Sequence, residues 1–137
     1  MGLYLCIFDG DDELGAVEVG SYSDWGSFTD HVTATLEGGS AGARFPTLIL
    51  HSDCDGEWTP TECSTLLSEL QTVQRELQSQ PPIPFAAEWQ SQAASRIGLQ
   101  PASAAESFVN VDGELLLHQL RRLAALAVER NLPILFQ

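Results

Sequence analysis

The segment from His51 to Trp58 carries the densest set of side chains that could do chemistry. Its sequence, HSDCDGEW, places carboxylates at alternate positions, Asp53, Asp55 and Glu57. Carboxylate oxygens suit calcium and magnesium, so one alternative is a metal-binding protein or a metal-dependent enzyme that uses this loop. The match to a calcium loop is poor, because the glycine comes two positions early and the twelfth position is serine. The other interpretation is a solvated acidic loop, with Trp58 packed at the start of the following helix.

A second chemical signature lies at residues 38–42, where the sequence GGSAG matches the letters of the nucleophile elbow of serine hydrolases. In that elbow a strand precedes the serine and a helix follows it, which strains the turn and exposes the hydroxyl. Here the expected order is reversed, with a helix before the motif and a strand after it. We therefore reject a serine hydrolase and predict a glycine-rich loop.

The three cysteines, Cys6, Cys54 and Cys63, indicate neither a disulfide framework nor a reactive thiol. Their number is odd, and no export signal precedes them, so we expect reduced thiols. Cys54 lies between two aspartates, which disfavour the thiolate that a nucleophile needs. Zinc would need more ligands in one cluster than Cys54 and His51 offer. We predict no catalytic residues, no metal site and no cofactor, and therefore a protein that is not an enzyme.

The elements that must position these loops begin with an apolar run from Leu3 to Phe8. Both faces of this run are apolar, which is typical of a central strand. A shorter strand is predicted from Leu14 to Val19, with valines on one face and Glu18 on the other. The acidic segment from Asp9 to Glu13 lies between them, so we expect the two strands to pair as a hairpin.

Two helices carry capping-box signatures at their starts. Ser21 and Asp24 have the required spacing, although Ser23 is a rival cap. Thr59 and Glu62 have the same spacing, and a proline follows Thr59 at the first helical position. An apolar stripe at helical spacing follows each start, which predicts that one face of each helix packs on the core.

The remaining elements complete an α+β pattern. We expect a second central strand at Phe45 to His51, a third helix at 85–97 and a short edge strand at 107–111. A fourth helix is expected at 116–127 and a terminal strand at Ile134 to Phe136. This order predicts a single domain over residues 1–137, with a mixed β-sheet of about four to five strands packed with about four helices.

The charge of the chain is strongly acidic and unevenly distributed. Nineteen acids stand against six bases, all of them arginine, for a formal net charge of −13. The absence of lysine excludes chemistry that depends on a phosphate-loop lysine or a Schiff base. Residues 1–62 hold twelve of the acids and a single base, Arg44, so most of the negative charge lies in the first half of the chain. We infer an acidic face that suits a basic partner.

Two acidic loops could form that face together. One follows the first strand, and the other follows the strand predicted at Phe45 to His51. If those strands are parallel neighbours, both loops emerge at the same edge of the sheet, beside Trp58. Two solubilising loops on separate sides remain the alternative. On the first interpretation the candidate partner-binding residues are Asp9, Asp11, Asp12, Glu13, Asp53, Asp55, Glu57 and Trp58.

Membrane insertion and export are not indicated. The longest apolar run, Leu3 to Phe8, is far shorter than the roughly 20 residues that span a bilayer as a helix. No basic segment precedes it, and Asp9 follows it directly, so it does not match a secretory signal. We expect a cytoplasmic protein.

Three segments resemble a family of small bacterial proteins, the predicted immunity proteins of polymorphic toxin systems. They are GLYLCIFDGDD from Gly2, VGSYSDWGSF from Val19 and FPTLILHSDCDGEW from Phe45. The similarity runs over most of the chain, through PILF from Pro133. The resemblance implies a cytoplasmic protein that binds and blocks a cognate toxin, but it supplies no binding residues.

Charge and resemblance together predict a non-enzymatic, cytoplasmic immunity protein that neutralises a cognate bacterial toxin through an acidic surface. A nuclease is one candidate toxin, because nucleic-acid clefts are basic. The partner is expected to be a basic toxin domain, without direct contact to nucleic acid or membrane. The alternatives are the metal-dependent protein described above and an interaction module of another bacterial assembly.

Overall fold

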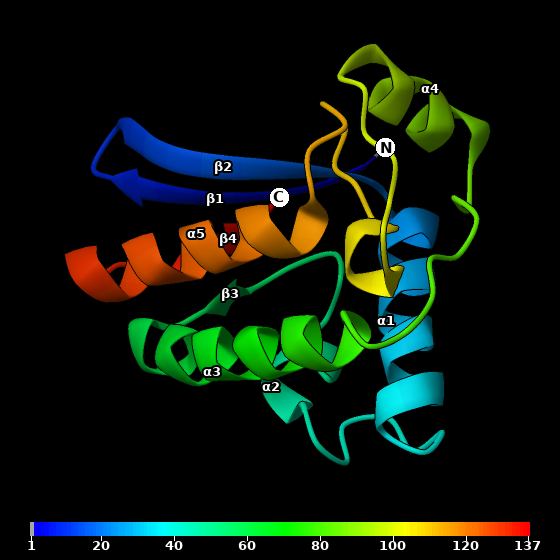
Figure 1. Ribbon diagram of the computed structural model, residues 1–137. Helices are drawn as coiled ribbons and strands as arrows, with labels where there is room; N and C mark the ends of the chain where they lie inside the picture. The colour runs from blue at the N-terminus through cyan, green and yellow to red at the C-terminus, as the bar shows by residue number, and fades with distance from the viewer. Residues whose placement is uncertain (1) are drawn as a thin grey trace.

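Four strands and five α-helices, with one short 3-10 helix, make up the computed structural model, which describes residues 2–137. In chain order they are β1 (Gly2–Asp9), β2 (Asp12–Ser21), α1 (Tyr22–Leu36), α2 (Pro46–Ile49), β3 (Glu57–Trp58), α3 (Pro60–Leu77), α4 (Glu88–Arg96), η1 (Ala104–Glu106), α5 (Leu116–Arg130) and β4 (Ile134–Phe136) (Figure 1).

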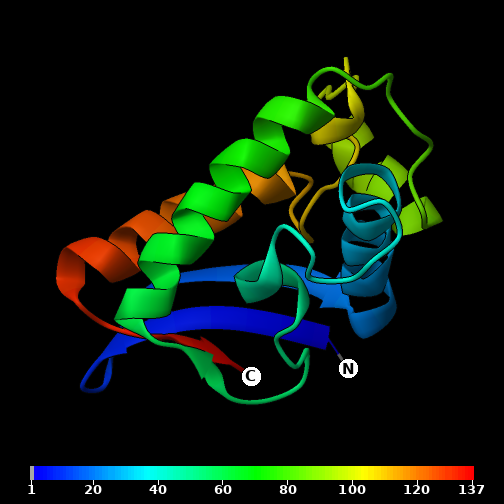
Figure 2. The same ribbon diagram turned by 90° about the horizontal axis from the view of Figure 1, so that it is seen from below.

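The four strands form one sheet in the order β2-β1-β4-β3. Every neighbouring pair is antiparallel, so the α+β class is confirmed, while the mixed sheet expected from the sequence is in fact antiparallel throughout. The terminal strand β4 lies inside the sheet, where Leu135 faces Cys6 of β1 on one side and Glu57 of β3 on the other. Figure 2 shows the helices gathered on one side of the sheet, with the other side left without a helix.

The β1–β2 hairpin forms as predicted, through a turn of two residues. Asp9 pairs with Asp12, and Gly10 between them has a φ of +61°. Type II′ turns, whose twist matches that of a hairpin, need glycine at this position. The pairing register shifts between Ile7 and Phe8, which marks a bulge close to the turn.

Both predicted capping boxes are confirmed. The Ser21 hydroxyl oxygen accepts from the Asp24 amide at 3.1 Å, and the Asp24 carboxylate accepts from the Ser21 amide at 2.7 Å. Thr59 and Glu62 make the same reciprocal bonds at 3.2 and 3.0 Å at the start of α3. These bonds satisfy amides that the first turn of a helix leaves without backbone partners.

The strand predicted from Phe45 to His51 is wrong, because this segment forms the short helix α2. Pro46 occupies its first turn, where a residue without an amide hydrogen is tolerated. The Glu69 carboxylate of α3 accepts from the amides of Leu48 and Thr47, at 2.9 and 3.3 Å. A side chain distant in sequence therefore satisfies the start of α2, and Leu48 is buried beneath it.

Two other sequence expectations are adjusted. The segment at 107–111 is not a strand, since it makes only an isolated bridge between Val109 and Leu115. Its last residue, Val111, donates its amide to the Glu18 carbonyl of β2 at 3.0 Å. The third helix, α4, begins at Glu88, three residues after the predicted start.

The helices form two layers on the inner side of the sheet. α5 lies against the sheet and α3 lies against α5, while α1 covers the end where β2 leaves the sheet (Figures 1 and 2). One buried cluster joins β1, β2 and β4 to α1, α3 and α5. Ile134 and Phe136 of β4 belong to it, with 1% and 6% of their surfaces exposed.

The loop between α1 and α2 is held by a buried carboxylate. Glu37 accepts from the amides of Gly42, Arg44 and Phe45 at 3.1, 3.0 and 2.9 Å, and it is 5% exposed. Burial alone would raise the pKa of Glu37, but these hydrogen bonds outweigh burial and hold the pKa below its usual value. The loop thus closes around a charge that it satisfies.

Deleting Ile134 to Gln137 should destabilise the protein by several kcal/mol. Burying an Ile or Phe side chain contributes about 1.5–3 kcal/mol, and the deletion also removes the strand that joins β1 to β3. Chemical denaturation measures the change, with Gln137→Ala as the control that keeps the backbone bonds to Tyr4. An unchanged denaturation midpoint for the truncated protein would contradict the position of β4.

The Glu37→Gln variant should be less stable by about 1–3 kcal/mol at pH 7, because the negative charge is lost and an NH2 group that cannot accept replaces one of the two acceptor oxygens. The pKa of Glu37 is lower in the folded protein, so its contribution is complete above the unfolded value of 4.5 and is lost as pH falls through the folded value. Denaturation at pH 7 and pH 3 should show the difference from wild type shrinking at the lower pH. Asp30→Asn, at an exposed helix position, is the control. A difference that is equal at both pH values would rule out this role for the charge.

Candidate partner-binding surface

The acidic hairpin tip, defined as Asp9 to Glu13, projects at one end of the molecule (Figures 1 and 2). All of its acidic side chains are exposed. Asp9 makes an ion pair of 3.5 Å with Arg130 at the end of α5, which ties the tip to that helix. The side-chain carboxylates of Asp11 and Asp12 accept no hydrogen bond from residues 2–137. The tip therefore presents carboxylates that are free to meet a partner.

Glu13 is held back onto the sheet by Tyr4. The Tyr4 hydroxyl donates to the Glu13 carboxylate, and this bond, with burial and the charge of Glu13, raises the pKa of Tyr4 to about 12. Tyr4 lies opposite Glu18, whereas Glu13 lies opposite Phe8, nearer the turn. The tyrosine ring must therefore extend along the sheet surface toward the tip to reach Glu13. Cys6 is 0% exposed although it lies on the side without helices, and burial raises the pKa of its thiol.

The outer face is the side of the sheet that no helix covers (Figure 2). Strand alternation places three exposed acids on it around half-buried apolar and aromatic residues. Glu18 lies opposite Tyr4, and Glu57 lies opposite Leu135. We define the outer face by its residues Tyr4, Cys6, Phe8, Glu13, Ala16, Glu18, Glu57 and Leu135. Its chemistry is that of an apolar centre within an acidic rim.

The second acidic loop lies at the opposite end of the sheet from the hairpin tip. The Gly56 carbonyl accepts a hydrogen bond from the Phe136 amide, and Phe136 lies opposite Leu5 in the first half of β1. Asp53 and Asp55 come before this point, so they lie toward the start of β1, whereas the tip follows its end. The two loops therefore do not share one edge, and the single face of seven carboxylates is wrong. Glu57 alone joins the outer face.

The physical reason is the topology around β3. The predicted strand before the loop is a helix, so the loop leads into a strand instead of leaving one. β3 and β1 run in the same direction but are separated by β4. His51 fixes the loop from within, since its ring stacks on Phe136 with centroids 4.1 Å apart. The two nitrogens of the same ring lie 2.6 and 2.9 Å from the carbonyl oxygens of Ser52 and Glu57.

Trp58 is not available as a surface anchor. Its side chain is 1% exposed, and its indole nitrogen donates to the Thr47 carbonyl at 2.9 Å. The ring meets Phe136 edge to face, with centroids 4.7 Å apart. Trp58 thus ties α2 to β4 inside the core. Its place in the candidate set came from its position beside acidic residues, which does not distinguish a buried from an exposed aromatic.

The alternative chemistries find little support in the structure. Across residues 2–137, no three His, Cys, Asp or Glu side chains converge so as to hold a metal ion. All three cysteines are free, as predicted, with Cys54 exposed and the other two buried. Burial raises the pKa of the Cys63 thiol to about 11, which opposes reactivity. The GGSAG segment links helix α1 to helix α2, not a strand to a helix.

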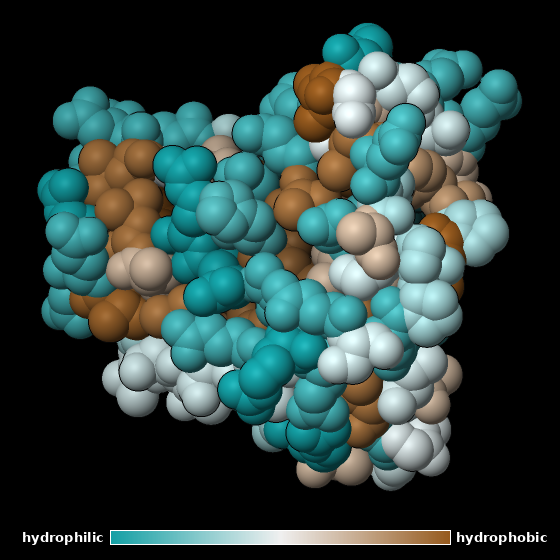
Figure 3. Space-filling view, in the orientation of Figure 1, coloured by the Kyte–Doolittle hydropathy of each residue, from teal (hydrophilic) through white to brown (hydrophobic). Residues whose placement is uncertain are grey.

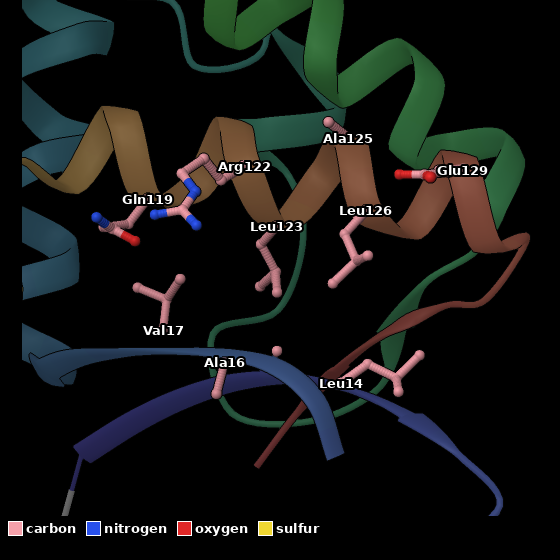
Figure 4. Close-up of a pocket in the computed structure, with 10 residues that line it drawn as sticks. Leu14, Ala16, Val17, Gln119, Arg122, Leu123, Ala125, Leu126 and Glu129 are labelled. Atoms are coloured by element: carbon pink, nitrogen blue, oxygen red, sulfur yellow. The ribbon is translucent and has the colours of Figure 1, made fainter. Parts of the chain in front are cut away.

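A groove of about 400 Å³ between β2 and α5 was not expected from the sequence (Figure 4). Val17 from the strand and Leu123 and Leu126 from the helix point into it, and Leu14 also lines it (Figure 4). Arg122 and Glu129 supply its charged border. Figure 3 shows an apolar area where the end of α5 lies in front of the hairpin, bordered by hydrophilic residues. Either segment alone gives only an ordinary amphipathic pattern, so the groove appears only when the two are packed together.

Comparison with known protein families finds a match that covers nearly the whole fold. A family model described as immunity protein 70 matches residues 3–136, from β1 through β4. No curated protein and no solved structure matches the chain. Within the described residues, no helix has both the length and the apolar character to cross a membrane. The family resemblance expected from the sequence is confirmed.

Trp58→Phe should lower stability without changing the partner-binding surface. The substitution keeps an aromatic ring in the core but leaves the partly buried Thr47 carbonyl without its donor, which costs about 1 kcal/mol. Denaturation measures the cost, and circular dichroism checks the fold. At a temperature where the variant is fully folded, partner affinity should equal that of wild type. A faster dissociation under those conditions would show that Trp58 contacts the partner after all.

Proposed function

Because the chain belongs to the immunity protein 70 family, we propose that it binds a cognate bacterial toxin and blocks the toxin's activity, without catalysing a reaction of its own. The family match over residues 3–136 is the observation that carries this proposal. Inhibition by binding needs a surface complementary to the toxin and no catalytic constellation. We further propose that the protein acts in the cytoplasm, where it protects the cell that makes it.

The distribution of acids supports an acidic binding surface. Several carboxylates are occupied within the fold, since Asp24 and Glu62 cap helices while Glu37 and Glu69 accept from loop and helix amides. Other carboxylates accept no hydrogen bond from any described residue. Within the hairpin these are Asp11, Asp12 and Glu18, all of them exposed. These unoccupied charges repel one another unless a partner compensates them. These exposed, unoccupied charges support the proposal that the tip and the outer face bind a basic protein.

We propose that the hairpin tip, Asp9, Asp11, Asp12 and Glu13, is the main acidic contact, and that Glu57 contributes through the outer face. Asp53 and Asp55 would contact only a partner that extends to the other end of the sheet. Trp58 has no place in this surface because it is buried.

The toxin partner is proposed to be basic. A nuclease fits this requirement, because a cleft built to grip phosphates carries Arg and Lys side chains. Carboxylates set on a hairpin tip could occupy such a cleft in place of phosphate groups. The immunity protein would then exclude the nucleic acid by competition, with no direct contact to it.

Neutralising the tip should slow association with the toxin. In the Asp11→Asn, Asp12→Asn double variant, long-range attraction weakens, so the association rate should fall and depend less on salt. Glu13 is left unchanged because its carboxylate accepts a hydrogen bond from the Tyr4 hydroxyl. Fold stability should hold or rise slightly, since like charges are removed. Stopped-flow association with the cognate toxin domain, at several salt concentrations, gives the measurement.

The matched control is Asp30→Asn, Asp112→Asn, which removes the same charge from exposed positions on α1 and after η1. An equal slowing in both double variants would indicate net charge and not the tip as the cause. Absence of any toxin binding by the wild-type protein would refute the proposed function itself.

A further inference from the structure

The outer edge of β2 is an open sheet edge. β2 has ten residues and stands at the end of the strand order, so one of its sides has no strand beside it. Proteins usually blunt such edges with lysine, proline or a covering segment, because unpaired amides and carbonyls recruit other strands. β2 contains neither lysine nor proline. The only backbone cover that we find among the described residues is Val111, whose amide bonds the Glu18 carbonyl.

The pairing pattern shows which backbone groups face outward. The amide and carbonyl of Tyr4 both bond to Gln137, so they point toward β4 and away from β2. By the alternation of an antiparallel ladder, the backbone groups of Cys6 point the same way. The residues opposite these two on β2, Glu18 and Ala16, must then direct their backbone groups to the open edge. Glu18 meets Val111 there, while Ala16 has no backbone partner within residues 2–137.

The groove between β2 and α5 lies along the same stretch of the strand. Its lining includes the consecutive residues from Leu14 to Val17, so it follows the strand where the edge is open. The Ala16 side chain points away from the groove, as Figure 4 shows, and only its backbone borders the space. At Gly15 the strand approaches α5 closely, since an added Cβ would lie 3.0 Å from Leu126. An open edge and an apolar groove therefore run side by side.

We propose that an extended segment of the toxin adds to the free edge of β2 at Ala16, with apolar side chains at alternate positions seated in the groove. The inference rests on the proposed function and names the site of that interaction. Strand addition supplies affinity through main-chain bonds and specificity through side-chain pockets. Basic residues of the segment face the end where β2 begins, because Asp12 and Glu129 border that end.

Charge complementarity selects a basic partner over a second copy of this chain. Edge-to-edge pairing of two copies would bring two chains of net charge −13 together, with an acidic tip at the start of each paired strand. A basic toxin segment turns the same charges into attraction. The bulge beside the tip and the Val111 contact limit the free edge to a short stretch, which suits a short segment better than a long strand.

The test compares two substitutions at one position. Ala16→Pro removes the outward amide, and proline is tolerated where an edge strand directs its amide to solvent. Ala16→Val keeps the amide and adds a side chain that suits a strand. Isothermal titration against the toxin should show about tenfold weaker binding for the proline variant, as expected for losing one or two bonds. The valine variant should bind within about twofold of wild type.

Amide hydrogen exchange in the wild-type protein supplies a second measurement that needs no variant. The Ala16 amide should exchange rapidly in the free protein and slow markedly in the toxin complex, while the Val111 amide is already protected. If the proline variant fails to fold, this measurement alone decides. Rapid exchange of Ala16 in the complex, or full affinity of a folded proline variant, would overturn the proposal.

Two further outcomes separate the inference from the function. A wild-type protein that neutralises the toxin while Ala16 stays unprotected leaves the immunity role intact and refutes strand addition. Light scattering could instead show a dimer of this protein that the proline substitution abolishes. A second copy would then occupy the edge, and strand addition by the toxin would also be refuted. Failure of wild type to bind the toxin would refute both proposals together.

Discussion

The pairing of β4 between β1 and β3 is the constraint on which the rest of the structure depends. Residues from the two ends of the described chain meet in it, with Cys6 opposite Leu135 and the Tyr4 backbone bonded to Gln137. β4 also carries Phe136, on which His51 stacks and against which Trp58 packs. The loop before β3, the short helix α2 and the start of α3 are thereby tied to the sheet through one three-residue strand.

That arrangement explains how much of the fold the sequence could predict. The hairpin, both capping boxes and the terminal strand were predicted from short-range signals such as Ser21 with Asp24, and these signals are confirmed. The segment at Phe45 was misassigned because its apolar run fits a buried strand and a buried helix equally well. The deciding contact comes from Glu69, more than twenty residues further along the chain, and no local pattern reveals it.

The candidate site was predictable in charge but not in geometry. The sequence identified the acids of the tip, and the structure leaves Asp11 and Asp12 exposed there. It could not show that Asp53 lies at the other end of the sheet, because that depends on strand order. Nor could it separate acids that stabilise the fold, such as Glu37, from acids that face solvent, because both occur in polar stretches of similar composition. Burial and hydrogen-bond partners make that distinction.

The position of β4 also bears on how the protein is made. β1 and β2 are synthesised before β4 and can pair as a hairpin without it, but β1 gains its second neighbouring strand only after residues 134–136 exist. Contacts between such distant parts of a chain are slow to form, because a long loop must close before they contribute any stability. Until then the apolar inner sides of the hairpin and of α3 have no complete core to cover them. A newly made chain therefore passes through an interval in which most of its residues exist but the complete sheet has not yet formed.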